Sequence, residues 1–175
     1  MAAATTCGSV LGQDMRAGSG AFGKPAMLIH EMTEKECHDA LGQAHFGRLA
    51  CVKNNQPYIV PVDFSYDGQH IYGVTTLGKK VEWMRANPLV CLEIDARADT
   101  HHWLSVIVFG RYEEIPDAPK YQHARMQALE ALQKRTLWWE PACVPAEGRE
   151  PRTTVFYRIE IEQVTGRRAT PIGQP

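Results

Sequence analysis

The sequence lacks several features that would place a protein in a specialised class. Its 175 residues carry 19 Lys and Arg against 20 Asp and Glu, a formal net charge of −1, so no basic field points to nucleic acid. No apolar run approaches the roughly 18 residues that a membrane-spanning helix needs. The first residues also lack a charged segment followed by a sustained apolar run, which argues against a secretory signal peptide. We therefore expect neither a nucleic acid nor a membrane among its partners.

Cysteine is present, but not in a pattern that builds a disulfide framework or a metal site. The cysteines are odd in number, scattered and without a C-x-x-C pair: Cys7, Cys37, Cys51, Cys91 and Cys143. This pattern favours reduced thiols and a cytoplasmic location. The adjacent His101 and His102 have no partner at ligand spacing, so no metal is expected. The chain also lacks the G-x-S-x-G, Walker, G-x-G-x-x-G and H-E-x-x-H motifs.

The composition is that of one ordinary globular domain. Apolar residues make up 44% of the chain and charged residues 22%, and the length is enough for a sizeable core. Residues 1–26 are rich in Ala, Gly and Ser without periodicity, which predicts a flexible N-terminal arm. We expect the domain itself over residues 27–168 and a C-terminal tail over 169–175.

A two-residue period of apolar side chains dominates the chain from residue 47 and predicts six strands. We expect them over residues 47–54, 57–66, 70–76, 89–95, 102–115 and 153–165. Thr33 and Glu36 have the spacing of a capping box before a helix over about 34–44, and further helices are expected over 78–87 and 117–135. The set is mainly β and favours a small β-barrel with peripheral helices over a sandwich or a doubly wound sheet.

Two residues predict irregularities within these strands. Pro61 cannot donate to a ladder of backbone hydrogen bonds, so its strand should lie at an edge, carry a bulge or meet a ligand there. Gly110 lies inside a long apolar strand and predicts a bulge or a bend.

The strand over 70–76 runs through a glycine turn into a helix, with the sequence Thr75-Thr76-Leu77-Gly78-Lys79-Lys80. Small hydroxyls, a flexible turn and two cations at a helix N-terminus are the groups that bind a phosphate. The alternative is an ordinary strand end followed by two solvated lysines. The residue types alone leave both interpretations open.

Three other segments have a functional and a structural interpretation. The strand around Val60, Pro61 and Val62 could present backbone groups to a flat ring, or could simply be a core strand. Ser105 lies in an apolar strand after Trp103, and its hydroxyl could bond a ligand or its own backbone. Adjacent Trp138 and Trp139 could cover a ligand, or cap the barrel or a subunit interface.

Five segments, in order and with matching spacing, resemble the pyridoxamine 5'-phosphate oxidase-like flavoproteins, and most closely the nitroimidazole-resistance (Nim-type) branch. They are GRLA (47–50), PYIVPVDF (57–64), IYGVTTLGKK (71–80), NPLVCLEI (87–94) and WLSVIVFGR (103–111). The resemblance spans about residues 27–165. It implies a six-stranded antiparallel split β-barrel that forms a homodimer, with flavin mononucleotide (FMN) in two clefts between the subunits.

The resemblance also implies roles for individual residues. It places Val60, Pro61 and Val62 beside the isoalloxazine ring, and Val74, Thr75, Thr76, Gly78, Lys79 and Lys80 at the ribityl chain and phosphate. Ser105 would make a polar contact to the flavin beside Trp103, and the loop with Trp138 and Trp139 would close over the ring from the other subunit. Two family features are missing: Gly73-Val74-Thr75 occupies the region where Nim-type chains carry a histidine, and the arginine-rich motif of true pyridoxamine phosphate oxidases is not seen.

We therefore expect an FMN-dependent oxidoreductase that passes reducing equivalents from NAD(P)H to a small flat acceptor, of nitroaromatic or quinone type. Tyr58, Ser105 and His102 are candidate acids or bases, and none stands out as the catalytic residue. The alternatives are a flavin-binding module without turnover, and a split barrel that binds haem or a deazaflavin. Haem would need His101 or His102 as its axial ligand.

Overall fold

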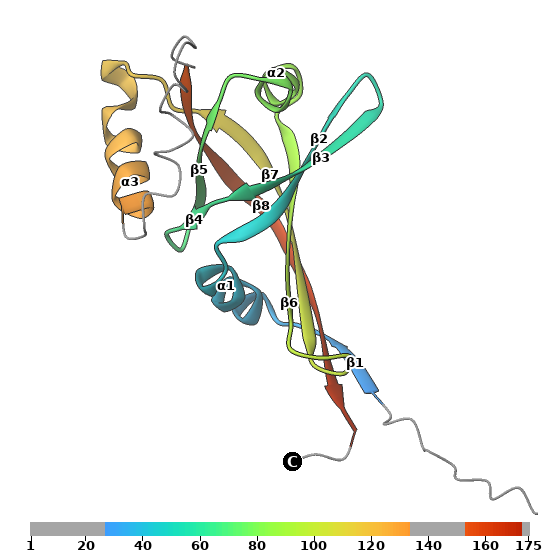
Figure 1. The fold of residues 1–175 in the computed structure, drawn as a ribbon. Helices are drawn as coiled ribbons and strands as arrows, with labels where there is room; N and C mark the ends of the chain where they lie inside the picture. The colour runs from blue at the N-terminus through green and yellow to red at the C-terminus, as the bar shows by residue number, and fades with distance from the viewer. Residues whose placement is uncertain (1–26, 134–152, 173–175) are drawn as a thin grey trace, which may run out of the picture.

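The computed structural model describes residues 27–133 and 153–172, which form one antiparallel sheet with helices around it (Figure 1). The strands are β1 (Met27–Glu31), β2 (Phe46–Lys53), β3 (Gln56–Asp63), β4 (Ser65–Tyr66), β5 (His70–Thr76), β6 (Leu89–Arg97), β7 (Trp103–Glu114) and β8 (Thr154–Pro171). The helices are α1 (Glu34–Gln43), α2 (Lys79–Ala86) and α3 (Gln122–Gln133), with a 3-10 turn, η1, at Pro119–Tyr121. No helix in these described ranges is long and apolar enough to cross a membrane.

The sheet wraps around a shared apolar core. Its strand order is β3-β2-β6-β7-β8-β5-β4, so β3 and β5 are far apart along the sheet. Yet Val62 from β3 and Ile71 from β5 belong to one buried cluster with Val108 from β7. Strands from both halves of the sheet therefore face each other across the core, as the curvature of the ribbon in Figure 1 shows.

β8 holds the two parts of the sheet together. Along one side it pairs with β7 through most of its length, and along the other it pairs first with β5 and then with β1. Between these two partners the N–H of Met32 donates to the carbonyl of Gly166 at 3.0 Å. A Cβ on Gly166 would stand 2.7 Å from the Cys37 sulfur of α1. The missing side chain thus lets α1 pack directly on the gap between β5 and β1.

The structure confirms the expected fold class, which is mainly antiparallel β with peripheral helices. It also differs from the expected elements in three ways: the strand expected over 57–66 is divided into β3 and β4, β1 is an additional strand, and β8 continues to Pro171 rather than ending at 165. The extension of β8 follows from β1, because Met27 pairs with Pro171 and Glu31 with Arg167. The side chains of β1 are largely exposed, so no burial pattern could mark it in the sequence.

Three local features that the sequence predicts are present in the structure. Thr33 caps α1 by accepting the N–H of Glu36 at 3.3 Å, and the Glu36 carboxylate accepts the N–H of Thr33 at 2.9 Å, which completes the capping box. Pro61 lies in β3, at the edge of the sheet. Gly110 marks a register shift between β7 and β8, as a bulge requires.

Gly73, in the middle of β5, is required by the packing of Tyr157 across the strand pair. A Cβ at Gly73 would stand 2.3 Å from the Cζ and hydroxyl oxygen of Tyr157. Tyr157 is only 1% exposed and stacks at an angle on Tyr112, with 5.6 Å between the ring centroids. The phenol therefore occupies the volume that a side chain at position 73 would need.

We predict that Gly73→Ala lowers the free energy of unfolding by about 1–3 kcal/mol, because the added methyl group overpacks the core against Tyr157. Gly42→Ala is the matched control: no atom lies within 4 Å of its Cβ position in α1, so the change should be neutral or stabilise by up to about 1 kcal/mol. Chemical denaturation of both variants measures the difference. Equal stability for the two variants would contradict the packing assigned to Tyr157.

Candidate functional site

The turn from β5 into α2 presents hydroxyls and backbone donors at one end of the sheet. Thr75 and Thr76 are half-buried at the end of β5, and the Thr75 hydroxyl makes only a long contact of 3.5 Å to the Thr76 carbonyl. Leu77 ties the turn to the start of β8 by donating its N–H to the Thr153 carbonyl at 3.1 Å. The turn is thus fixed by backbone bonds, while its hydroxyls remain able to bind a ligand.

Gly78 begins α2 and leaves the helix N-terminus open. No side chain from the described part of the chain caps this end. The φ of Gly78 is 173°, an extended conformation that any residue adopts, so the backbone does not demand glycine. No atom lies within 4 Å of the position that a Cβ would take. Gly78 therefore leaves free space in front of unsatisfied N–H groups, where an anion can approach closely.

Lys80 is a half-buried cation that makes no ion pair within the described part of the chain. Burial lowers the pKa of Lys80 below its ordinary value, and the Cys51 thiol is the group whose charge would favour the ammonium. No carboxylate in residues 27–133 or 153–172 pairs with it. A partly desolvated ammonium that lacks an anionic partner is costly, and an incoming phosphate would remove that cost.

Lys79 lies beside Lys80 and rests on two aromatic rings. Its ammonium nitrogen is 4.7 Å from the ring centroid of Tyr58 and 4.7 Å from that of Trp83. Tyr58 comes from β3 and Trp83 from the next turn of α2, and their own centroids are 5.4 Å apart. Lys79 itself is exposed. Two cations and an aromatic pair therefore gather at this end of the sheet.

The other residues predicted near this end are placed in different ways. In β3, Val62 is buried and Val60 half-buried, while Pro61 is exposed. Val74 is 6% exposed and packs in the cluster beneath α3, so only its backbone could contact a ligand at the turn. The structure thus brings Thr75, Thr76, Gly78, Lys79 and Lys80 together as one turn, with β3 supplying Tyr58 beside it.

Trp103 and Ser105 lie at the opposite end of the sheet. Lys80 is close to Cys51, which pairs with Val90 near the start of β6, whereas Trp103 pairs with Arg97 at the end of β6. The nine residues of β6 separate its ends by roughly 25 Å at about 3.3 Å per residue. One chain alone therefore does not bring Ser105 to the turn over residues 75–80, which we call the lysine turn.

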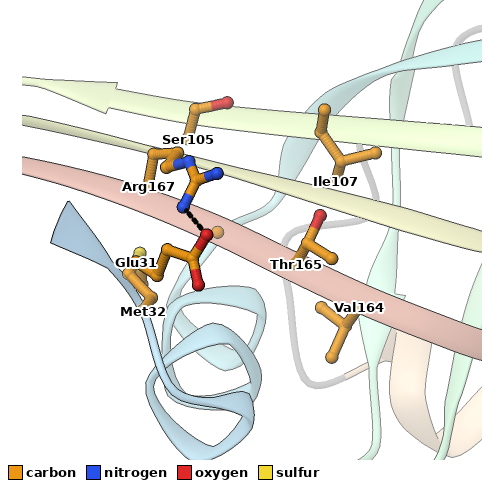
Figure 2. A pocket seen from close by; sticks show the side chains of 8 residues that line it. Glu31, Met32, Ser105, Ile107, Val164, Thr165 and Arg167 are labelled. Carbon is orange, nitrogen blue, oxygen red and sulfur yellow. Dashed lines mark ion pairs between the residues drawn. The ribbon is translucent and has the colours of Figure 1, made fainter. Parts of the chain in front are cut away.

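Ser105 instead lines a cavity of about 390 Å³ between β7, β8 and the segment after β1 (Figure 2). Its hydroxyl makes a long contact of 3.5 Å to Glu93. Figure 2 shows Arg167 on β8 paired with Glu31, and Ile107 and Val164 are among the other residues that line the cavity. The cavity combines an ion pair, hydroxyls and apolar walls, a mixture typical of small-molecule sites.

Two further sets of residues complete the comparison with the sequence. Trp138 and Trp139 lie outside the described residues. His102 is engaged by Asp99, whose carboxylate is 2.8 Å from its Nδ1 and also accepts the backbone N–H groups of His101 and His102. These bonds lower the pKa of Asp99 to about 2 and order the turn between β6 and β7.

Sequence reasoning missed the aromatic pair and the Glu31–Arg167 ion pair. Lys79 and Trp83 are four residues apart in a predicted helix, so their contact could have been inferred from the helical spacing. Tyr58 could not, because β3 meets α2 only through the tertiary fold. The ion pair depends on β1, which carried no signal.

The curved sheet is thus a split barrel in which an open helix N-terminus and two adjacent lysines lie at one end. The chain belongs to the pyridoxamine 5'-phosphate oxidase family, whose sequence profile matches residues 33–168. An uncharacterized protein of Rhizobium meliloti is 37% identical over 146 residues, which cover 82% of this chain and 97% of that protein.

Solved structures with the same fold agree. A FAD-binding protein from Mesorhizobium loti has 42% sequence identity and a TM-score of 0.68, covering 83% of this chain and 99% of its own. A structure named for 5-nitroimidazole antibiotic resistance, from Bacteroides thetaiotaomicron, has 16% identity and a TM-score of 0.60, covering 82% of this chain and 89% of its own. At that identity the second likeness concerns the fold alone.

We predict that Lys80→Met stabilises the ligand-free protein by about 0.5–2 kcal/mol, because it removes a partly buried charge that has no carboxylate partner in the described residues. The folded pKa of Lys80 lies below the ordinary 10.5, so the unfolded chain binds its proton more tightly. The free energy of unfolding of the wild type should therefore increase as the pH rises from the folded pKa of Lys80 towards 10.5. Lys80→Met should lack this increase. Thermal denaturation across that pH range, with exposed Lys79→Met as the control, measures both effects; a destabilised Lys80→Met would contradict them.

Proposed function

We propose that this chain is a flavin-dependent oxidoreductase that holds the phosphate of an FMN unit at the turn between β5 and α2. The observation that carries the proposal is Lys80, a half-buried ammonium without a carboxylate partner in the described ranges. Lys79, the Thr75 and Thr76 hydroxyls and the open end of α2 supply the remaining contacts that a phosphate dianion needs. The residues of this turn are therefore of the types that a flavin phosphate would need.

The choice of a flavin among phosphate-bearing ligands is supported by relatives. The Mesorhizobium loti protein that is 42% identical to this chain is named for binding FAD. FMN and FAD share the same riboflavin phosphate, so both fit a cradle built for that unit. The isoalloxazine ring would then lie against β3 near Val60, Pro61 and Val62, where the edge strand offers backbone groups to a flat ligand.

We further propose that the working form is a homodimer with the flavin between the subunits. Ser105 and Trp103 lie at the far end of β6 and β7 from the lysine turn, so they could contact a flavin only if it were held by a second copy. Leu89 and Phe109 are 50% and 46% exposed on the neighbouring strands β6 and β7, which would suit a buried interface.

The proposed reaction takes place in the cytoplasm. When bound, the flavin supplies the two-electron chemistry between NAD(P)H and a small flat acceptor of nitroaromatic or quinone type. The chain's own share is to bind the phosphate, orient the ring and exclude water from one face of it. Arg167 and the hydroxyls of Ser105 and Thr165 would provide polar contacts for the acceptor or the nicotinamide.

The visible absorption spectrum of the purified protein is the first test. We expect the two-banded spectrum of an oxidised flavin, bleached when NADPH or NADH is added without oxygen. A flavin spectrum that neither nucleotide bleaches would replace the oxidoreductase with a flavin-binding module. A Soret band would indicate haem, and a colourless protein that takes up no added flavin would remove the cofactor assignment.

Replacing both lysines tests the phosphate cradle directly. Lys79→Ala with Lys80→Ala removes two charge-assisted contacts, so flavin affinity should fall at least about a hundredfold while the barrel stays folded. The matched control is Lys35→Ala with Lys120→Ala, two exposed lysines on α1 and η1 that should leave affinity unchanged. Calorimetric titration with FMN gives the affinities. Undiminished binding by the first pair would place the phosphate elsewhere.

A further inference from the structure

Two aromatic side chains, Tyr58 and Trp83, lie beside the lysine turn. A ligand that ends in a phosphate monoester would not need them for binding. Tyr58 and Trp83 are both half-buried, and their rings are inclined at 55° with centroids 5.4 Å apart. The Lys79 ammonium is 4.7 Å from each ring centroid. Because Lys79 is exposed and lies on both rings, the ring faces that it covers border solvent.

The position of Lys79 is one that a bound anion would change. A cation–π contact at an exposed site is weak compared with a charge-assisted hydrogen bond to a phosphate oxygen. Lys79 makes no ion pair with a carboxylate of the described chain. A phosphate near Lys80 would therefore draw Lys79 off the rings and expose the ring faces of Tyr58 and Trp83 beside the phosphate.

The two lysines differ in a way that suits a diphosphate. Lys80 is half-buried within the end of the sheet, whereas Lys79 is on the exposed side of the same turn. One phosphate can lie at Lys80 and the open end of α2, and a second can lie further out at Lys79. A group attached to the outer phosphate then reaches the Tyr58 and Trp83 rings.

We propose that Tyr58 and Trp83 form an adenine subsite, so that the chain binds FAD more tightly than FMN. This inference rests on the proposed flavin function and adds to it the identity of the second half of the cofactor. Purine rings stack on aromatic side chains, and the stacking contributes enough to favour the dinucleotide about tenfold or more. The isoalloxazine end of the site is the same for both ligands.

The test measures dissociation constants for FAD and for FMN with the full-length protein freed of flavin. We expect FAD to bind wild type at least about tenfold more tightly than FMN. Trp83→Leu should weaken FAD about tenfold and leave FMN unchanged, while Trp83→Phe should keep most of the preference. Unchanged FMN affinity shows at the same time that the variant is folded. Tyr121→Leu is the control, since Tyr121 carries a similar lysine contact with Lys120 on η1, away from the site.

The outcomes separate this inference from the proposed function. FMN binding as tight as FAD in wild type, or an equal loss of both ligands in Trp83→Leu, would overturn the adenine subsite and leave the flavin function standing. Failure of both flavins to bind wild type would overturn both. If Trp83→Leu does not fold, Tyr58→Leu provides the same comparison, and an unaltered ratio of the two affinities would again overturn the subsite.

Discussion

The fold depends on the backbone pairing of one strand, β8. It shares one side with β7 and divides the other between β5 and β1, so it is the element common to both parts of the sheet. A strand of this length with unpaired donors and acceptors would be both unstable and prone to aggregate, and here three neighbours satisfy it. Gly166 and Gly110 allow the two departures from regular pairing that β8 needs, a helix packed on its open edge and a bulge against β7. The curvature that faces β3 towards β5 follows from these constraints.

The candidate site, the turn from β5 into α2, lies at one end of the sheet that β8 holds together. Lys80 is held where burial disfavours its charge, and no carboxylate from the described residues compensates for it. Elsewhere in the described structure two arginines have carboxylate partners: Arg48 lies 3.1 Å from Glu93, and Arg85 contacts Glu114 at 2.7 Å. Within the described ranges, then, these arginines have carboxylate partners and Lys80 has none. A half-buried cation with no carboxylate partner in the described residues supports the proposal that an anionic ligand binds here.

Much of the fold could be predicted from the sequence because its signals are local. The capping box at Thr33, the edge position of Pro61 and the bulge at Gly110 each depend on a few neighbouring residues, and each was found. The missing elements depend on distant contacts: β1 is a strand only because β8 extends to meet it, and Tyr58 meets Lys79 only when β3 folds against α2. For the site, the sequence grouped Thr75 to Lys80 as one turn but could not show that Ser105 lies at the other end of β6 and β7. The family resemblance assigns Ser105 and the lysine turn to one flavin site, but within one chain they lie far apart.

Gly73 and the lysine turn are close in sequence, but they differ in what the structure allows at each position. At Gly73, in the region where Nim-type chains carry a histidine, the phenol of Tyr157 fills the space that any side chain would need. A proton donor could be introduced there only by removing a buried aromatic residue from the core, which is a change of packing and not of surface chemistry. The lysine turn two residues further along is unaffected by this choice, because Thr75 and Thr76 are fixed by the end of β5 and its pairing with β8. The proposed phosphate-binding residues and the position of the Nim-type histidine are thus different residues of one strand, so a shared phosphate turn would not imply a shared reaction.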